Sequence, residues 1–178
     1  MHNFESKVFT IWLTGLSGSG KSTLAFNLKG SLLRLNYCCA VLDGDDVRRG
    51  INSDLDFSLN GRNENVRRVA EIAKTLNDQG YFVIVALISP LRSQREIASN
   101  IIGKDNFKEV YLDASLDVCE IRDVKGLYKK ARKGLIQNFT GISADYESSL
   151  TPDITIHTGF DDEKKSLDIL LNFFLSKI

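Results

Sequence analysis

A glycine-rich stretch near the N-terminus limits the possible folds of this chain more than any other feature. Residues 15–22 read Gly-Leu-Ser-Gly-Ser-Gly-Lys-Ser, and the apolar run Val8–Leu13 comes just before them. They match the pattern G-x-x-x-x-G-K-[ST], which joins a strand to a helix and wraps backbone N–H groups around phosphates. The glycines permit the tight turn, and the helix that follows adds the positive end of its dipole. A Gly- and Ser-rich turn without a ligand is the weaker alternative.

The residue types in this loop predict their roles. Lys21 would neutralise the β- and γ-phosphates of a nucleotide, and the Ser22 hydroxyl would hold Mg²⁺, which is the expected cofactor. The predicted nucleotide-binding residues are those of the loop and the start of its helix: Gly15, Leu16, Ser17, Gly18, Ser19, Gly20, Lys21, Ser22 and Thr23.

Composition limits the partners of the protein. The 178 residues suffice for one core, so we expect a single domain over residues 1–178. The chain has 23 basic residues (Lys and Arg) and 23 acidic residues (Asp and Glu), so its net charge is zero, which argues against nucleic acid as a partner. No apolar run suggests a membrane span or a signal peptide, so a cytoplasmic protein is expected. Cys38, Cys39 and Cys119 have no metal-ligand spacing and are expected to pack in the core.

Hydrophobic periodicity along the rest of the chain alternates between strands and helices. Apolar runs predict strands at 8–13, 39–42, 81–88, 109–112 and 154–157. Helical stripes predict helices from the loop to about 35, at 63–78, 93–102 and 116–121, and from about 161. This alternation predicts an α/β fold, a P-loop NTPase-type three-layer sandwich with a mostly parallel five-stranded sheet. Residues 122–150 are rich in Lys, Arg and Gly and are predicted to form a mobile lid.

A cluster of carboxylates follows the second predicted strand. Ligands of parallel sheets bind beyond the carboxyl ends of the strands, and the sequence there reads Asp43-Gly-Asp45-Asp46. These carboxylates could lie near Mg²⁺ and an acceptor hydroxyl. Asp43 and Asp45 would share a face if the strand continues. The alternative is that the same residues form a turn and cap a helix.

Arginines and two phenylalanines are candidates for binding a second substrate. Six arginines follow strand ends or lie on the predicted helix at 63–78: Arg48, Arg62, Arg67, Arg68, Arg92 and Arg95. Each would either bind an anion through two hydrogen bonds or be a solvated surface charge. Phe57 and Phe139 lie in otherwise polar stretches. They would form either a platform for a stacked base or a small satellite core.

Taken together and in this order, the motifs resemble the adenylylsulfate (APS) kinase family, whose members phosphorylate the ribose 3′-hydroxyl of APS with MgATP to give PAPS. The resemblance extends from Ile11 to about Thr158. Besides the glycine-rich loop it rests on Leu42-Asp-Gly-Asp-Asp-Val-Arg48, Phe57-Ser58, Arg62 with Glu64-Asn-Val-Arg-Arg68, Ile88-Ser-Pro90, Val118-Cys-Glu-Ile-Arg-Asp123, Lys125-Gly-Leu-Tyr-Lys129 and Phe139-Thr-Gly-Ile142.

The resemblance implies a role for each matching position. Asp43 would be the base for the acceptor hydroxyl, Asp45 a metal ligand beside Ser22, and Lys21 the third catalytic residue. Arg122 would lie on the adenine of ATP. The implied acceptor-binding residues are Asp43, Arg48, Phe57, Arg62, Asn65, Ile88, Ser89, Lys125 and Phe139. Among these, Phe57 and Phe139 would sandwich the adenine of APS. Arg48, Arg62 and Asn65 would hold its phosphosulfate and ribose.

Two further properties follow from the family. In some members the residue equivalent to Ser89 carries a phosphoryl group, so Ser89 is a candidate phosphoserine. Members are usually dimers, so a homodimer is the expected assembly, with ATP and APS as the small-molecule substrates.

The sequence also departs from the family pattern. Gly61 stands where Asp is common, Leu91 and Gln94 differ from the usual residues of their stretch, and Asp46 replaces a typical Asn. These departures leave open another nucleotide-linked acceptor, such as the cytidine diphosphoramidate that relatives use in capsule synthesis. A nucleotide-dependent switch is a further alternative, because residues 123–126 match D-x-x-G, but no N-K-x-D motif follows.

Overall fold

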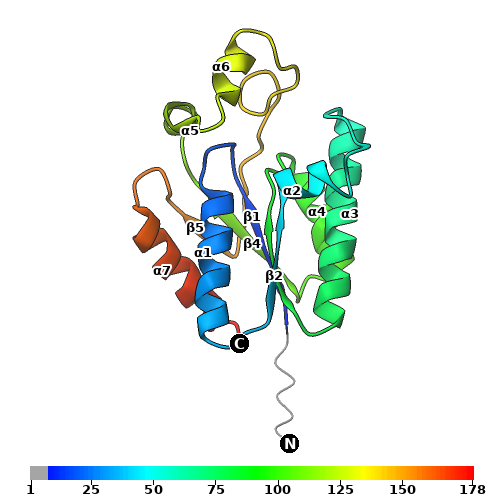
Figure 1. The fold of residues 1–178 in the computed structure, drawn as a ribbon, viewed down its shortest axis with the longest axis vertical. Coiled ribbons are helices and arrows are strands. Elements are labelled where there is room, and N and C mark those ends of the chain that lie inside the picture. Colours follow the sequence, from blue (N-terminus) through cyan, green and yellow to red (C-terminus); the bar gives the residue numbers. More distant parts are fainter. Residues whose placement is uncertain (1–7) are drawn as a thin grey trace, which may run out of the picture.

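Five parallel strands form the centre of the molecule (Figure 1). The computed structural model describes residues 8–178, so residues 1–7, on which part of the localisation expectation rests, lie outside the described residues. The strands are β1 (Thr10–Thr14), β2 (Cys39–Asp43), β3 (Phe82–Ala86), β4 (Phe107–Leu112) and β5 (Ile154–Ile156). Their order is β2-β3-β1-β4-β5, and every adjacent pair is parallel, which confirms the predicted fold class.

Helices cover both faces of this sheet (Figure 1). On one face lie α1 (Lys21–Arg34) and α7 (Glu163–Leu175), and on the other lie α3 (Leu59–Asp78) and α4 (Arg92–Ile102). Three short helices lie beyond the carboxyl ends of the strands: α2 (Gly44–Arg49), α5 (Leu116–Arg122) and α6 (Leu127–Arg132). No helix in residues 8–178 combines the length and apolar character needed to cross a membrane.

Side chains of β1 show why the strands are apolar throughout. Successive residues of a strand point to opposite faces of the sheet. Ile11 and Leu13 accordingly pack with α1 and α7, whereas Trp12 packs with α3 and α4. Because both faces are covered, polar residues would be buried on either side. The long apolar runs of the sequence are thus a direct consequence of the three-layer arrangement.

An aromatic cluster closes the amino-terminal end of the sheet. The ring centroids of Phe82 and Phe174 are 4.8 Å apart, and those of Phe9 and Phe82 are 5.1 Å apart, both in edge-to-face geometry. Tyr37 packs edge-to-face on Phe82 and Phe174 as well. Edge-to-face packing places a positive ring edge on a negative ring face. The cluster joins α7 to β1 and β3 and fixes the position of this C-terminal helix.

Several predicted boundaries need correction. Of the two alternatives for residues 43–46, the structure shows the helix cap, because α2 begins at Gly44 and the Asp43 side chain caps it, so the strand does not continue. Helix α3 begins at Leu59 rather than Asn63, since the Ser58 hydroxyl caps its first turn. Cys38 is exposed and does not pack in the core, unlike Cys39 and Cys119.

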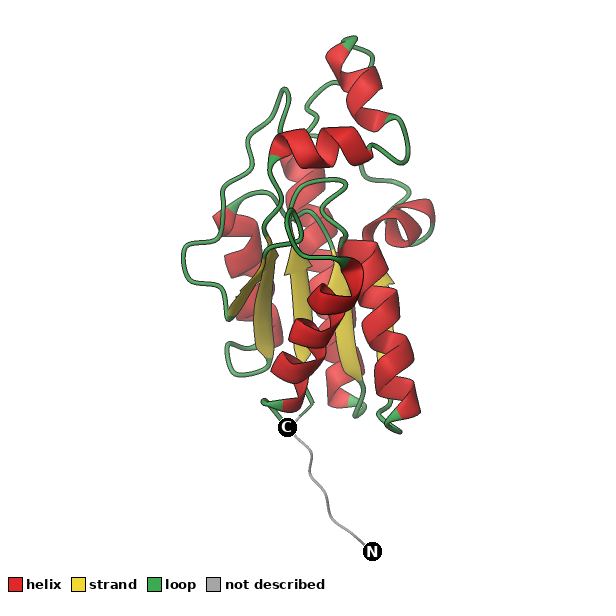
Figure 2. Cartoon of the chain, turned by 90° about the vertical axis from the view of Figure 1, so that its left-hand side faces the viewer, coloured by secondary structure: helices red, strands yellow, loops and turns green. Residues whose placement is uncertain are grey.

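The segment predicted to be a lid shares a small core with the residues before it. Tyr128 of the lid is buried there together with Ala114 and Cys119, and partly buried apolar side chains pack around them, among them Phe139. Figure 2 shows the short helices of this region above the sheet. The satellite core explains how a stretch with weak periodicity is held in place. Mobility of residues 122–150 stays a prediction.

We expect the aromatic cluster to contribute strongly to stability. Phe174 is 1% exposed, so Phe174→Ala should lower the free energy of unfolding by about 3–5 kcal/mol. Phe160 is 92% exposed, so the matched Phe160→Ala should change it by less than about 0.5 kcal/mol. Denaturant titrations of both variants test this, and equal effects would contradict the assigned core.

Candidate active site

The glycine-rich loop is pressed against its neighbours, and two of its glycines are required by that close approach. A Cβ on Gly15, whose φ is 152°, would lie 2.8 Å from the carbonyl oxygen of Leu112 at the end of β4. A Cβ on Gly18, whose φ is 79°, would lie 2.9 Å from the carbonyl oxygen of Cys119. Any side chain at these positions would displace the loop from β4 and α5. The loop is therefore held in one place at the carboxyl edge of the sheet.

Lys21 is buried within its own loop. Its ammonium donates to the carbonyl oxygens of Gly15 at 2.9 Å and Leu16 at 2.7 Å. Burial lowers the pKa of Lys21 to about 8, because the charged form loses hydration. The first turn of α1 has no side-chain cap at Gly20, so its N–H groups remain available for an anion. Phosphate oxygens here would restore the full charge of the lysine.

Three residues from later in the chain donate hydrogen bonds to backbone carbonyls of the loop. Tyr128 donates its hydroxyl to the carbonyl of Ser17 at 2.8 Å, and Thr158 donates to that of Ser19 at 2.8 Å. Arg122 donates to the carbonyls of Gly18 at 3.3 Å and Thr158 at 2.5 Å. Arg122 was predicted to act here, but Tyr128 and Thr158 were not. The one available signal was an isolated tyrosine among the lysines of α6.

Asp43 connects the loop to the second strand. Its Oδ2 accepts from the Ser22 hydroxyl at 2.6 Å, and its Oδ1 accepts from the backbone N–H of Asp45 at 3.0 Å. The Asp45 carboxylate is instead paired with Lys125 of the lid. Of the two predicted carboxylates, Asp43 is thus the one in contact with Ser22.

These side chains fit a magnesium ion that arrives with phosphates. Hydroxyl and carboxylate oxygens are the hard ligands that Mg²⁺ prefers, and it usually takes only one or two from the protein. Within residues 8–178 no group of three or more His, Cys, Asp or Glu side chains is placed to hold a metal unaided. Ser22 with Asp43 or Asp45 would therefore supply part of a coordination sphere that nucleotide and water complete.

Arg48 and Arg62 form a second cationic centre, in addition to Lys21. Arg48 donates to the carbonyls of Leu55 at 3.2 Å and Asp56 at 3.1 Å, and its guanidinium lies 4.3 Å from the ring centre of Phe57. Burial lowers the pKa of both guanidiniums, and the charge of Arg62 lowers that of Arg48 further. Their hydrogen-bond acceptors in the described chain are neutral oxygens, and the nearby Asp56 carboxylate offsets only part of the lowering of the Arg48 pKa.

Arg62 also joins the two segments that carry the candidate stacking residues. It donates to the carbonyl of Phe57 at 3.0 Å, to the Thr140 hydroxyl at 2.6 Å and to the carbonyl of Asn138. The Phe139 ring packs edge-to-face on Tyr128 with centroids 5.0 Å apart, as a member of the satellite core. Phe57 is mostly exposed. The site residues of α3 and of the lid are therefore held together through Arg62.

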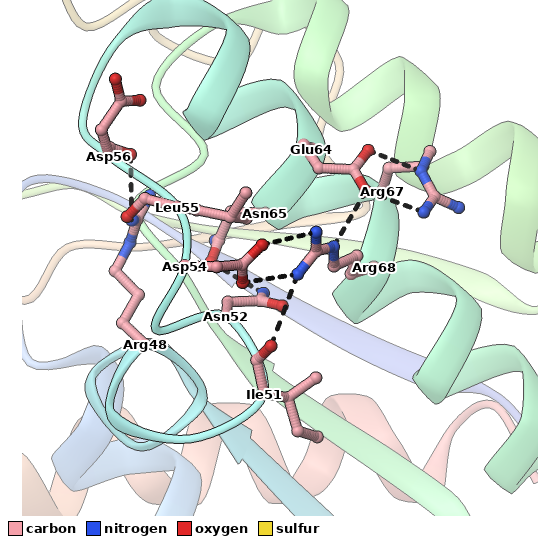
Figure 3. A network of polar contacts seen from close by, with 10 residues as sticks. All are labelled: Arg48, Ile51, Asn52, Asp54, Leu55, Asp56, Glu64, Asn65, Arg67 and Arg68. Carbon is pink, nitrogen blue, oxygen red and sulfur yellow. Dashed lines mark hydrogen bonds and ion pairs between the residues drawn. The ribbon is translucent and has the colours of Figure 1, made fainter.

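The other predicted acceptor residues make internal contacts. Asn65 is buried and accepts from the Asn52 amide at 3.0 Å (Figure 3). The carbonyl of Ile88 accepts from the Thr14 hydroxyl at 2.7 Å. Ser89 is buried, has a φ of 38°, and its hydroxyl accepts from the indole N–H of Trp12 at 3.0 Å. That hydroxyl is therefore buried and bonded to the indole, and phosphorylation of Ser89 stays a prediction.

Of the four remaining arginines, Arg92 donates to the carbonyl of Ser148 at 3.0 Å, and the other three divide into two kinds. Arg67 and Arg68 pair with Glu64 and Asp54 on the outer surface of α3 (Figure 3), and these bonds lower the pKa of Glu64 to about 2. Arg95 is buried instead. Its guanidinium pairs with Glu109 at 2.9 Å and donates to the carbonyls of Ser89 at 2.8 Å and Glu147 at 2.7 Å. Arg95 therefore fastens the turn after β3 to β4 and to the end of the lid.

Comparison with known proteins identifies the family. Residues 7–157 match the sequence profile described as Adenylylsulphate kinase. The chain belongs to the adenylylsulphate kinase family. The adenylyl-sulfate kinase of Bacteroides thetaiotaomicron is 52% identical over 168 residues, which are 94% of this chain and 84% of that protein. That of Clostridium acetobutylicum is 48% identical over 169 residues, 95% of this chain and 84% of that protein.

A solved structure supports the same assignment. The APS kinase of Mycobacterium tuberculosis, in complex with AMPPNP and APS, superimposes with a TM-score of 0.89 at 40% identity, covering 95% of this chain and 98% of that one. This adenylylsulphate kinase chain nevertheless departs from the family pattern at Gln94. Gln94 is buried and accepts from the N–H of Leu91 at 3.3 Å, while its amide donates to Asn63 at 2.9 Å. It caps α4 and joins it to α3.

We expect Arg95→Met to be costly, because it leaves the Glu109 carboxylate buried without its partner. The free energy of unfolding should fall by about 3–5 kcal/mol. Adding Glu109→Gln should recover part of that loss, since the unpaired charge is then removed. The matched Arg67→Met removes only exposed ion pairs and should cost about 1 kcal/mol or less. Denaturant titrations compare the variants, and a mild effect of Arg95→Met would contradict a structural role.

Proposed function

We propose that this protein transfers the γ-phosphoryl group of ATP to the ribose 3′-hydroxyl of APS, giving PAPS and ADP. One observation carries the proposal. Arg48 and Arg62 form a half-buried pair of guanidiniums whose described partners are neutral oxygens, and one of them lies over the exposed ring of Phe57. Such a centre suits an anion attached to an aromatic base, as APS is. It lies in a chain whose relatives at about half identity are named adenylyl-sulfate kinases.

The donor half of the site would be the glycine-rich loop. Phosphoryl transfer asks the protein mainly to position the reactants and to stabilise negative charge. Lys21 and the uncapped N–H groups of α1 would surround the phosphates of ATP. Arg122, already bonded to Gly18 and Thr158, would lie beside its adenine. Mg²⁺ held through Ser22 and an aspartate would neutralise charge on the β- and γ-phosphates when bound.

Asp43 is the residue we assign as base. Its carboxylate is at the carboxyl end of β2 and accepts from the Ser22 hydroxyl at 2.6 Å, so it lies beside the proposed donor half. It would accept the proton of the 3′-hydroxyl as the ribose oxygen bonds to the γ-phosphorus. The bond between that phosphorus and the bridging oxygen breaks in the same step, and ADP leaves. Lys21 would stabilise the charge that develops on the transferred group.

The acceptor half would hold APS by charge and stacking. Arg48 and Arg62 would bind the phosphosulfate, and Phe57 and Phe139 would lie on the two faces of the adenine. Since Arg62 already bonds to Phe57 and Asn138, one side chain would set both the anion site and the distance between the rings. Lys125, now paired with Asp45, would turn to the substrates as the lid closes.

A different nucleotide-linked acceptor, such as cytidine diphosphoramidate, is the second candidate. It was motivated by Gly61 and Gln94, the departures from the family pattern. Gln94 caps a helix. The space that a side chain at residue 61 would need is filled by Asp56. Neither residue supplies an observation in favour of the second acceptor, so APS is the substrate that we propose.

The assembly and the location of the protein also remain proposals. We expect a homodimer, as the family resemblance implies. A solved relative, from Thiobacillus denitrificans, is a hexameric APS kinase of which this chain covers 29%. A hexamer is therefore the alternative. Cytoplasmic localisation is the expectation from the sequence.

Turnover assays test the proposed activity. Purified protein with ATP, Mg²⁺ and APS should form ADP and PAPS in equal amounts. A substrate panel that includes cytidine diphosphoramidate should show the highest kcat/KM for APS. A protein that is folded and binds ATP, but does not turn over APS, would rule the proposal out.

Asp43→Asn separates chemistry from folding at the proposed base. Asparagine caps helices as well as aspartate does, so the unfolding free energy should change by less than about 1 kcal/mol. The amide cannot accept the proton, and kcat should fall by roughly 100-fold or more. Circular dichroism melting and steady-state kinetics provide the two readouts. If Asp43→Asn kept near-normal kcat, Asp43 would not be the base.

A further inference from the structure

Gly61 is the third residue of α3, and a neighbouring turn fills the place of its missing side chain. A Cβ at this position would lie 2.2 Å from Oδ1 of Asp56 and 2.5 Å from the Asp56 carbonyl oxygen. Real Cβ atoms do not approach other atoms so closely, and the carbonyl belongs to the backbone, so it cannot simply rotate away. The turn of residues 55–58 can therefore hold this position only because residue 61 is a glycine.

The Asp56 carboxylate completes the cap of α3. The Ser58 hydroxyl accepts from the N–H of Gly61 at 3.1 Å, as an N-cap serine does. In a capping box, an acidic or amide side chain at the third helical position reaches back to the N-cap N–H. Gly61 has no such side chain. Oδ1 of Asp56 instead accepts from the Ser58 N–H at 3.1 Å and from its hydroxyl at 2.6 Å.

The same turn holds both arginines of the proposed acceptor site. The carbonyl of Asp56 accepts from Arg48 at 3.1 Å, which Figure 3 shows, and the carbonyl of Phe57 accepts from Arg62 at 3.0 Å. The Phe57 ring lies under the Arg48 guanidinium, 4.3 Å from its carbon. A shift of Asp56 would thus move two guanidiniums and one aromatic ring at once.

We propose that Asp56, seated against Gly61, is a positioning residue for acceptor binding. Its carboxylate fixes the 55–58 turn on the N-terminus of α3, and the turn sets the positions of Arg48, Phe57 and Arg62. The inference rests on the proposed function for the identity of the acceptor, but the local geometry is independent of it. Asp56 itself need not touch the substrate.

Three single variants test the inference. Asp56→Ala removes the cap and should raise KM for APS by roughly 2- to 30-fold, which is the fold-change that corresponds to the free energy of one helix cap. Asp56→Asn keeps an acceptor oxygen and should stay within about 3-fold of the wild type. Gly61→Ala forces the turn away from α3 and should raise KM for APS at least as much as Asp56→Ala. In all three, KM for ATP should be unchanged and kcat should change by less than about 2-fold.

Matched controls separate this effect from helix propensity. Gly30 lies in α1, and a Cβ there would lie 3.7 Å from the Arg34 side chain, an ordinary contact distance, so Gly30→Ala should leave KM for APS unchanged. Asn60→Ala alters the exposed neighbour of Gly61 and should leave it unchanged as well. The double variant Asp56→Ala/Gly61→Ala should be little worse than Gly61→Ala alone, because both changes act through one turn.

Two outcomes would overturn the inference. One is a KM for APS that Asp56→Ala and Gly61→Ala leave unchanged. The other is a rise in KM for APS that is accompanied by a proportional rise in KM for ATP and a proportional fall in thermal stability, as general unfolding would produce. Amide hydrogen exchange of residues 58–61 provides a readout without substrate, and Asp56→Ala should accelerate it. If the wild type does not turn over APS, the proposed function fails, while the exchange data still decide whether Asp56 holds the turn.

Discussion

The burial of Lys21 inside its own loop is the interaction on which the rest of the site depends. An ammonium group leaves water only if oxygens replace its hydration, and the carbonyls of Gly15 and Leu16 do so. The loop can present them only while it is pressed against β4 and α5, where Gly15 and Gly18 leave no space for a side chain. The fold thus holds a cation at the end of the central strand before any phosphate binds.

The lid is part of this arrangement rather than a separate cover. Tyr128 and Arg122 bond to the loop carbonyls, Arg62 bonds to Asn138 and Thr140, and Arg95 bonds to the carbonyl of Glu147. Movement of the lid would therefore be transmitted to the donor loop and to the proposed acceptor arginines together. In a two-substrate enzyme, such coupling would link closure to the presence of both ligands.

Local patterns predicted much of the molecule correctly. The strand and helix periodicities located the five strands, and the glycine-rich motif located the loop, because both signals depend on neighbours in sequence. The predicted start of α3 was too late, because the Ser58 hydroxyl caps the helix before its apolar stripe begins. The sequence left open whether the chain at Asp43 continues β2 or caps a helix, and the structure shows that Asp43 caps α2. Both capping residues can be read from the sequence. The free energy of a capped helix start is, however, close to that of continuing the strand or loop, so the sequence alone does not decide between them.

The sequence by itself determined the fold class, the position of the phosphate loop and the family. It could not distinguish structural arginines from candidate substrate-binding arginines, because the burial of a guanidinium depends on which groups from distant parts of the sequence surround it. Arg95 is structural because it forms an ion pair with Glu109 and bonds to the carbonyls of Ser89 and Glu147, whereas Arg48 and Arg62 donate hydrogen bonds to neutral oxygens. Only the tertiary structure decided that division, just as only the approach of Asp56 explains why residue 61 is a glycine.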